Sequence, residues 1–237
     1  DTVMVASGDG FIHLYGRDTI TGRLKHLNRS VAGHAKECVS IDTNHSNLII
    51  SGGWDGAVLL FNASGRLLST RSRVHNTSYR VTMHPSDKEI FASSGGDGKV
   101  VLHDSRINSS TSVINHTGHM DILTIDWNKY DRQMIVSGSA DGIIRMFDTR
   151  RNNACLLSFK AHRRAVKKLV CSPFNKSLLM TCSYDMSVAV WDLKAPFVPA
   201  AKESSFTEFV TGLDHSLFKP NTFYSCSWDQ SMREFTF

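Results

Sequence analysis

The chain has 237 residues, of which 41% are hydrophobic and 21% charged, and this is the composition of a globular protein with a sizeable core. No apolar run approaches the roughly 18 residues of a membrane-spanning helix, so we expect no direct insertion into a membrane. The net charge of +5 comes from scattered basic residues, which favours a mildly basic surface over a nucleic-acid site.

Cysteine usage and the first residues of the chain indicate a reducing compartment. Five cysteines occur, an odd number, and none forms a CxxC pair. The opening DTVMVASGDG lacks the basic head and apolar middle of a secretory signal. We therefore expect a cytoplasmic protein. Because histidine and cysteine do not gather at ligand spacing, we expect no metal and no cofactor.

The first predicted elements place the start of the chain inside a repeating unit. Residues 3–10 read as a second strand and its turn, and residues 11–16 as a third strand. The turn phrase then returns, as SGGWDG at Ser51–Gly56 and as SGSADG at Ser137–Gly142. A period of 42–46 residues between successive turns indicates a repeat architecture. The six turn aspartates are Asp9, Asp55, Asp97, Asp141, Asp185 and Asp229.

The fourth unit illustrates the predicted strands most clearly. Residues 122–127 and 134–139 are β-rich, alternating runs separated by a polar turn. A turn at Asp141–Gly142 joins the second run to a third strand over 143–148, because glycine tolerates the positive φ that tight hairpins need. Residues 156–160 supply a fourth strand. No helical stretch is predicted, so the chain is expected to be all-β.

Two further signals recur once per unit. The third strand ends in a degenerate aromatic–Asp pair, intact at Trp191–Asp192, partial at Phe147–Asp148 and His103–Asp104, and lost at Glu234–Phe235. A histidine precedes four of the units, at His34, His75, His119 and His162.

This combination of HxxxV, S-x-x-D and [WF]D every 44 or so residues resembles WD-repeat β-propellers. The resemblance implies one propeller domain over residues 1–237, with six visible units of which the first is incomplete. It further implies a seven-bladed ring whose N-terminal blade is missing from this chain. We expect the histidine and the turn Asp of each unit to share a buried hydrogen-bond network, which is a structural role.

No catalytic set emerges from the sequence. Ser139 stands one position too early for a nucleophile elbow, and no helix follows it. Neither a GxGxxG fingerprint nor a phosphate-binding loop occurs. We therefore expect a binding protein and not an enzyme.

In the WD-repeat fold, three positions of each blade face one rim. One is the residue ahead of the turn Asp, and the other two flank the first residue of the leading strand. The residue ahead of the Asp varies from glycine to tryptophan, which the turn itself does not require, at Gly8, Trp54, Gly96, Ala140, Tyr184 and Trp228. The flanking positions are assigned to Glu37 and Val39, Tyr79, Asp121 and Leu123, Ala165 and Lys167, and Glu208 and Val210.

The chain resembles one WD-repeat family more specifically, the peroxin-7 family of receptors for type 2 peroxisomal targeting signals. The stretch TEFVTGLDHSL followed by CSWD carries the likeness, with weaker support from AKECVSIDT and SGGWDG. The likeness implies a cytoplasmic import receptor that shuttles to the peroxisome or glycosome. It also implies a co-receptor, either the long form of peroxin-5 or a fungal equivalent.

The cargo of that family carries an N-terminal nonapeptide with a basic residue, a Leu-like residue, five variable residues, His or Gln, and Leu or Ala. At about 100° per residue, positions 1, 2, 8 and 9 of a helix fall within about 120° of one another. The signal is thus an amphipathic helix, which an acidic and aromatic rim complements.

The predicted peptide-binding residues fall into two chemical classes. The carboxylates expected to meet the basic residue or the histidine of the signal are Glu37, Asp121 and Glu208. The side chains expected to contact its apolar residues are Trp54, Leu123, Tyr184 and Trp228, and Tyr79 is the remaining candidate at a flanking position. The alternative is that the carboxylates are merely solvated and that the two indoles cover neighbouring blades.

A rival function belongs to another class. His103–Arg106 and Phe147–Arg150 resemble the WDxR box of substrate receptors for cullin-type ubiquitin ligases. A propeller that binds histones or RNA is a further alternative, raised by the positive charge, and a steep fall of affinity with salt would favour it.

Overall fold

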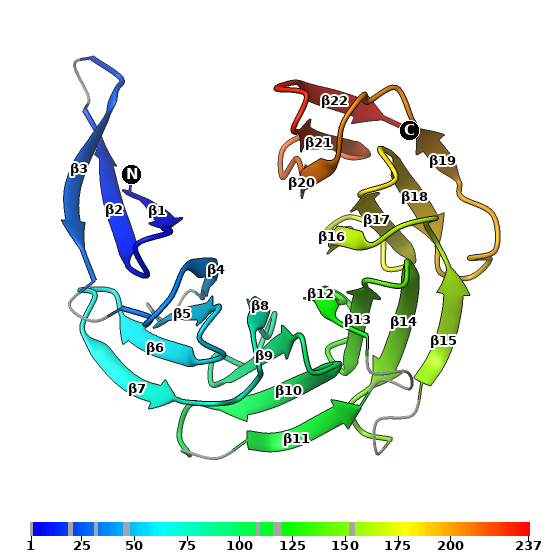
Figure 1. Cartoon of the computed structure of the whole chain (residues 1–237). Helices are drawn as coiled ribbons and strands as arrows, with labels where there is room; N and C mark the ends of the chain where they lie inside the picture. The colour runs from blue at the N-terminus through cyan, green and yellow to red at the C-terminus, as the bar shows by residue number, and fades with distance from the viewer. Residues whose placement is uncertain are drawn as a thin grey trace. The chain divides into compact units, whose positions relative to one another are not determined.

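The computed structural model describes residues 2–18, 21–30, 33–44, 48–107, 110–115, 120–151 and 155–237. All regular elements in these ranges are β-strands, which confirms the all-β expectation. The strands form six antiparallel sheets (Figure 1). No helix with the length and apolarity to cross a membrane occurs in these ranges.

The chain divides into two compact units, Asp1–His116 and Thr117–Phe237, each with three sheets. The first sheet of the first unit has three strands among the described residues. Its strands are β1 (Thr2–Ala6), β2 (Ile12–Arg17) and β3 (Leu24–Arg29). The second sheet contains β4 (Cys38–Thr43), β5 (Leu48–Gly53), β6 (Val58–Asn62) and β7 (Leu67–Arg71), and the third contains β8 (Ser78–Met83), β9 (Ile90–Gly95), β10 (Lys99–Asp104) and β11 (Ser110–Asn115).

The second unit repeats the four-stranded pattern twice and ends with a three-stranded sheet. Its first sheet contains β12 (Ile122–Trp127), β13 (Met134–Ser139), β14 (Ile143–Asp148) and β15 (Cys155–Lys160). The second contains β16 (Val166–Cys171), β17 (Leu178–Ser183), β18 (Val188–Asp192) and β19 (Ala201–Glu203), and the last contains β20 (Val210–His215), β21 (Thr222–Ser227) and β22 (Met232–Thr236). The prediction of a seventh blade, and of one domain over the whole chain, stays a prediction.

The tight turn between the second and third strands has the backbone that the Asp-Gly signal predicts. Gly56 has a φ of +74°, and a Cβ atom there would lie 2.0 Å from the carbonyl oxygen of His75. In the last two sheets the same position is occupied by Met186 and Gln230, with φ of +66° and +65°. A side chain is therefore tolerated at this position, at the cost of left-handed strain.

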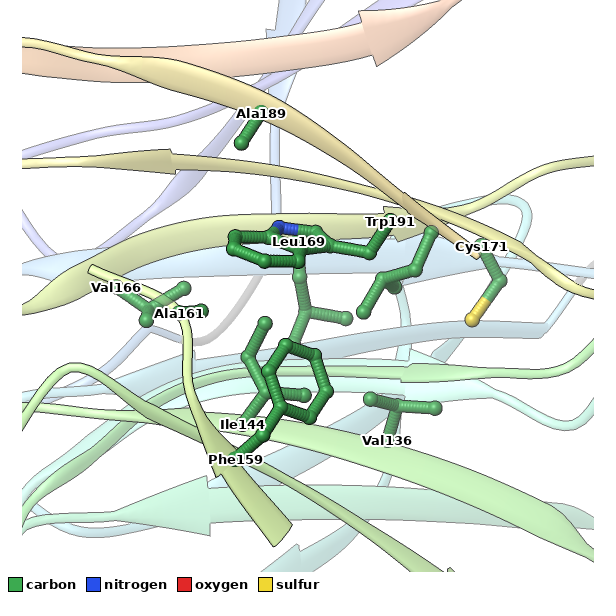
Figure 2. Packing of buried hydrophobic residues seen from close by; sticks show 10 residues of the cluster. Val136, Ile144, Phe159, Ala161, Val166, Leu169, Cys171, Ala189 and Trp191 are labelled. Carbon is green, nitrogen blue, oxygen red and sulfur yellow. The ribbon is translucent and has the colours of Figure 1, made fainter. Parts of the chain in front are cut away.

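Each hydrophobic core lies between neighbouring sheets of one unit. In the second unit, buried Val136 and Ile144 of one sheet pack with Leu169 and Trp191 of the next (Figure 2). The ring of Phe159 lies 5.1 Å from the ring of Trp191, centroid to centroid. The inner strands of each four-stranded sheet are the most deeply buried, as in β13 and β17, whereas outer strands such as β15 are largely exposed.

The leading strands β4, β8, β12, β16 and β20 share one irregularity. In each of them the pairing with the next strand shifts after the first residue, so that one residue is left over as a β-bulge. The extra residues are Val39, Tyr79, Leu123, Lys167 and Thr211. Within each unit, consecutive leading strands pack side by side.

Candidate functional site

The histidines and turn aspartates form buried networks, as expected. His162 places Nδ1 3.1 Å from a carboxylate oxygen of Asp185 and Nε2 2.7 Å from the hydroxyl of Thr181. Trp191 donates its indole N–H to the same hydroxyl at 2.9 Å. All of these groups form hydrogen bonds within one blade, so the network has a structural role.

The network recurs in the first unit and changes elsewhere. His34 and His75 contact their turn aspartates at 2.9 and 2.8 Å. The predicted network is therefore confirmed in the second and third sheets. His119 lies outside the described residues, and the turn aspartate of the same repeat, Asp141, contacts Arg145 at 3.2 Å. In the last sheet the buried Phe206 occupies the position in the repeat at which His162 stands in the sheet before. The Asp229 carboxylate accepts from the hydroxyl of Ser231.

The networks hold the aspartates in their charged form. Burial raises the pKa of Asp185, but hydrogen bonds from His162 and Ser187 outweigh it, and the net pKa lies well below its usual range. Asp55 has a lowered pKa for the same reason, because the backbone amides of Ala57 and Ala35 outweigh its burial. The turn aspartates are thus fixed anions of the scaffold and are unsuited to proton transfer at neutral pH.

The residue ahead of each turn Asp lies beside the residue that precedes the leading strand. Its backbone N–H donates to the carbonyl of that residue, as Trp54 does to Glu37 at 3.0 Å and Ala140 to Asp121 at 2.9 Å. The same bond joins Tyr184 to Ala165 at 3.1 Å. Two of the three rim positions predicted for each blade are therefore neighbours, and the bulge residue is the third.

The assignment in the last sheet is wrong by one residue. β20 begins at Val210, and Trp228 donates its backbone N–H to the carbonyl of Phe209 at 3.0 Å. The flanking positions are therefore Phe209 and Thr211 and not Glu208 and Val210. Glu208 is exposed beside them, and its carbonyl accepts from the hydroxyl of Ser227 at 3.1 Å. One repeat of 44 residues counted from Ala165 leads to Phe209. The repeat length alone could therefore have predicted the correct flanking position.

Correcting the register completes a row of three aromatic rings in the second unit, which we call the aromatic row: Tyr184, Phe209 and Trp228. The ring of Phe209 lies 4.9 Å from that of Tyr184 and 5.4 Å from that of Trp228, centroid to centroid. Trp228 is 62% exposed and the other two are partly buried. The guanidinium of Arg164 lies 6.0 Å from the centre of the Phe209 ring, within the range of a cation–π contact.

The remaining predicted residues of the second unit, Asp121 and Leu123, lie at the start of β12. Asp121 and Leu123 flank Ile122, the first residue of that strand, and both are partly buried. Leu123 is the bulge residue. At the equivalent positions of β16 stand Ala165 and Lys167, so the rim of this unit carries both charges and not acid alone.

The first unit holds the other three predicted residues. Trp54 is 45% exposed beside partly buried Glu37, through the backbone bond given above. Tyr79 is the bulge residue of β8 and is partly buried. Trp54 and Glu37 are thus joined through their backbones in this unit, and their role in binding a peptide stays a prediction.

In each of the two boxes that resemble the ligase motif, the arginine pairs with the aspartate of the same box. Arg106 donates to the carboxylate of Asp104, and this hydrogen bond lowers the pKa of Asp104 to about 2. Arg150 makes the same pair with Asp148 at 2.9 Å. The side chains of Arg106 and Arg150 remain 66% and 61% exposed, so each guanidinium has a face open to a partner.

In the described part of the chain, no group of three or more His, Cys, Asp or Glu side chains is arranged to hold a metal ion. The five cysteines are free thiols, of which Cys155 and Cys226 are exposed.

Three segments match the WD40 family, described as WD domain, G-beta repeat, over residues 25–62, 110–148 and 153–192. The chain is also similar to the small ribosomal subunit protein RACK1 of Drosophila melanogaster, with 29% identity over 94 residues. That similarity covers 39% of this chain and only 30% of the relative. Neither match names the peroxin-7 family, so the finer resemblance stays a prediction. WD-repeat propellers generally serve as non-enzymatic scaffolds for protein interactions. The repeats and the six sheets together identify the chain as a WD-repeat protein with a β-propeller fold.

Proposed function

We propose that the protein is a cytoplasmic import receptor that binds the N-terminal type 2 signal helix of peroxisomal matrix proteins. The aromatic row carries this proposal. Three rings side by side, with the outermost 62% exposed, offer a rigid apolar surface of the kind that anchors interfaces. The sequence around this row, TEFVTGLDHSL and CSWD, is also the stretch in which the resemblance to peroxin-7 is most specific.

The chemistry of the row suits one face of an amphipathic helix. The two apolar residues of a type 2 signal lie on the same face, and burying two Leu-sized side chains contributes about 3–6 kcal/mol before the cost of association. This gain supports a transient complex, as a shuttling receptor requires. Exposed charge pairs add only about 0–1 kcal/mol each.

We assign the charged residues of the signal to carboxylates of the same unit. Asp121, directly before β12, and exposed Glu208, before β20, are the acidic groups that we assign to the basic residue and the histidine of the signal. In the first unit Glu37, joined to Trp54 by a backbone hydrogen bond, is the acidic residue at the equivalent position. A co-receptor such as the long form of peroxin-5 would cover the bound helix, exclude water and strengthen these charge pairs.

A titration with a fluorescent nonapeptide of the signal pattern tests the proposal. Trp228→Ala should weaken binding about 30-fold, the effect expected of an interface anchor worth about 2 kcal/mol. Phe218→Ala is the matched control, because Phe218 is 94% exposed on the loop between β20 and β21 and should leave affinity unchanged. If the signal peptide and a peptide with its basic residue and histidine reversed in charge bind equally well, the proposal is wrong.

Charge reversal at Asp121 tests the electrostatic part separately. Asp121→Lys should abolish binding of the signal peptide while leaving the circular dichroism spectrum unchanged. Asp131→Lys, at an exposed turn position of the same sheet, controls for the change in net charge. Unchanged affinity in Asp121→Lys would remove Asp121 from the site.

The second candidate is a substrate receptor of a cullin-type ubiquitin ligase, favoured by the exposed faces of Arg106 and Arg150. Co-purification separates the two functions. An import receptor retains peroxin-5 or signal-bearing enzymes, whereas a ligase module retains its cullin adaptor and loses it in an Arg106→Ala, Arg150→Ala double variant. Co-sedimentation with ribosomal subunits would instead support the role that the name of the fly relative describes.

A further inference from the structure

A cavity of about 350 Å³ lies in the first unit, and none of the predicted peptide-binding residues lines it. It is lined by the end of β7, the segment that follows it, and β10 and β11. Its volume falls at the lower end of the range of about 300–1,000 Å³ that is typical of small-molecule sites. The size fits a small ligand better than a length of polypeptide.

The lining of the cavity is strongly basic. Arg71, Arg73 and Lys99 are all lining residues, and none of the described residues that line it is acidic. Arg71 is only 7% exposed, and its Nη2 donates to the carbonyls of Asp104 at 2.6 Å and Ile107 at 2.5 Å. One of the three cations is therefore fixed in place by the fold, while Arg73 and Lys99 are exposed at the mouth.

Arg73 is held in an unusual backbone conformation. Its φ is +56°, in the left-handed region that residues with a Cβ atom rarely adopt. Backbone strain of this kind persists where the surrounding structure imposes it, and it is common at binding sites. The strain places a second arginine at the cavity, two residues after Arg71.

A buried histidine adds a neutral hydrogen-bonding group. His103 is 1% exposed, lines the cavity and has no hydrogen-bond partner for Nδ1 among the described residues. Burial lowers the pKa of His103 to about 3, with a further contribution from the charge of Arg71, so its ring is uncharged at neutral pH. The positive charge of the cavity thus comes from the two arginines and the lysine alone.

The hydrogen-bond chain behind His103 bears on its tautomer. When His75 is neutral, the Asp97 carboxylate accepts from its Nδ1–H at 2.8 Å, and its Nε2 accepts from the Ser93 hydroxyl at 2.8 Å. The Ser93 oxygen then accepts from Nε2–H of His103, also at 2.8 Å. In that arrangement Nδ1 of His103 is an acceptor that no described residue satisfies, and a donor on the occupant of the cavity would complete it.

We propose that this cavity binds a small soluble phosphate monoester. Such a group carries anionic oxygens for the three cations, and its second pKa of about 6 leaves part of it with a P–OH donor near neutral pH. A carboxylate or a sulfate supplies the negative charge without that donor. This site does not depend on the peptide-binding proposal, because its residues all lie in the first unit and none belongs to the aromatic row.

Calorimetric titration of the whole chain with inorganic phosphate, O-phosphoserine and sulfate tests the proposal. Both phosphates should bind, and sulfate should bind at least about tenfold more weakly because it lacks the donor. Lys99→Gln and Arg73→Ala should each weaken phosphate binding about tenfold. Lys88→Gln is the matched control, since Lys88 is an exposed lysine of the same unit that does not line the cavity.

Three results would overturn the proposal. The first is the absence of phosphate binding by the wild-type protein, and the second is equal binding of sulfate. The third is an equal loss of affinity in Lys88→Gln, which would mean nonspecific attraction to a basic surface. If a phosphoserine peptide binds more than tenfold tighter than free O-phosphoserine, the occupant is a protein segment and the assignment to a small molecule is wrong. Signal-peptide binding, measured in the same Lys99→Gln variant, should be unchanged.

Discussion

Replacing His162 by alanine tests the role of the buried networks in holding a blade together. The imidazole is fully buried, with its Nδ1 3.1 Å from Asp185 and its Nε2 2.7 Å from Thr181. The substitution removes both hydrogen bonds and leaves a space behind them. Asp185 and Thr181 each keep a hydrogen bond in this variant. Asp185 still accepts from the backbone N–H of Arg163 at 3.0 Å, and Thr181 still accepts from the indole N–H of Trp191 at 2.9 Å.

The expected loss of stability follows from these contacts. A hydrogen bond to a charged group contributes about 1.5–3 kcal/mol and a neutral one about 0.5–1.5 kcal/mol. Together they predict that His162→Ala lowers the free energy of unfolding by about 2–4 kcal/mol. The remaining partners of Asp185 and Thr181 keep the loss from rising to the full cost of desolvating a buried charge.

Urea unfolding followed by circular dichroism at pH 7 measures this loss. Arg163→Ala is the control, because its side chain is exposed and only its backbone contacts Asp185. The pKa of Asp185 is lower in the folded state than the unfolded value of about 3.9, so the stability it contributes is present above about pH 4 and is lost as the pH falls further. The difference between wild type and variant should shrink below about pH 4. A loss below about 1 kcal/mol at pH 7, or a difference that grows in acid, would refute the reasoning.

Three further predictions concern other sites. Arg106→Ala should raise the pKa of Asp104 from about 2 toward its ordinary value, as measured by carboxyl carbon NMR; an unmoved titration would show that the guanidinium does not stabilise the carboxylate. A thiol reagent should modify Cys155 and Cys226 rapidly and leave the buried cysteines unreacted until the protein unfolds, and rapid reaction of more than two thiols would contradict the burial. Gln230→Gly should raise thermal stability by about 0.5–1 kcal/mol, since relief of the left-handed strain exceeds the added chain entropy; a lower melting temperature would contradict that balance.

The strands of the chain could be predicted from sequence because pattern and turn chemistry agree. Residues 122–127, 134–139 and 143–148, expected from alternation and from the Asp-Gly turn, coincide with β12, β13 and β14. The fourth strand, expected at 156–160, begins one residue earlier, at Cys155. Local propensity and the repeat gave the same answer here, which is the condition under which sequence reasoning succeeds.

The register of the last leading strand could not be read from its own residues. The histidine that marks the other units is replaced there by Phe206, whose buried ring packs against Phe235. With that marker gone, the flanking positions were placed one residue early, at Glu208 and Val210. An error of one residue on a strand exchanges its two faces, so a carboxylate was expected where Phe209 stands.

The bulges explain why the fold can be predicted from this sequence more readily than the ligand can. The extra residue of a bulge makes no ladder hydrogen bond, so its side chain is free of the constraints that act on its neighbours. Tyr79, Leu123 and Lys167 differ in size and charge at equivalent positions because none of them holds the sheet together. The residue ahead of the turn Asp is joined to the residue before the leading strand by a backbone hydrogen bond, as at Trp54 and Ala140, so that bond does not depend on its side chain. Folding therefore constrains the histidines and aspartates, and recognition is left to positions that folding does not fix. For that reason a variant that exchanges the side chains of Trp54 and Ala140 should keep the stability of the propeller and change what it binds.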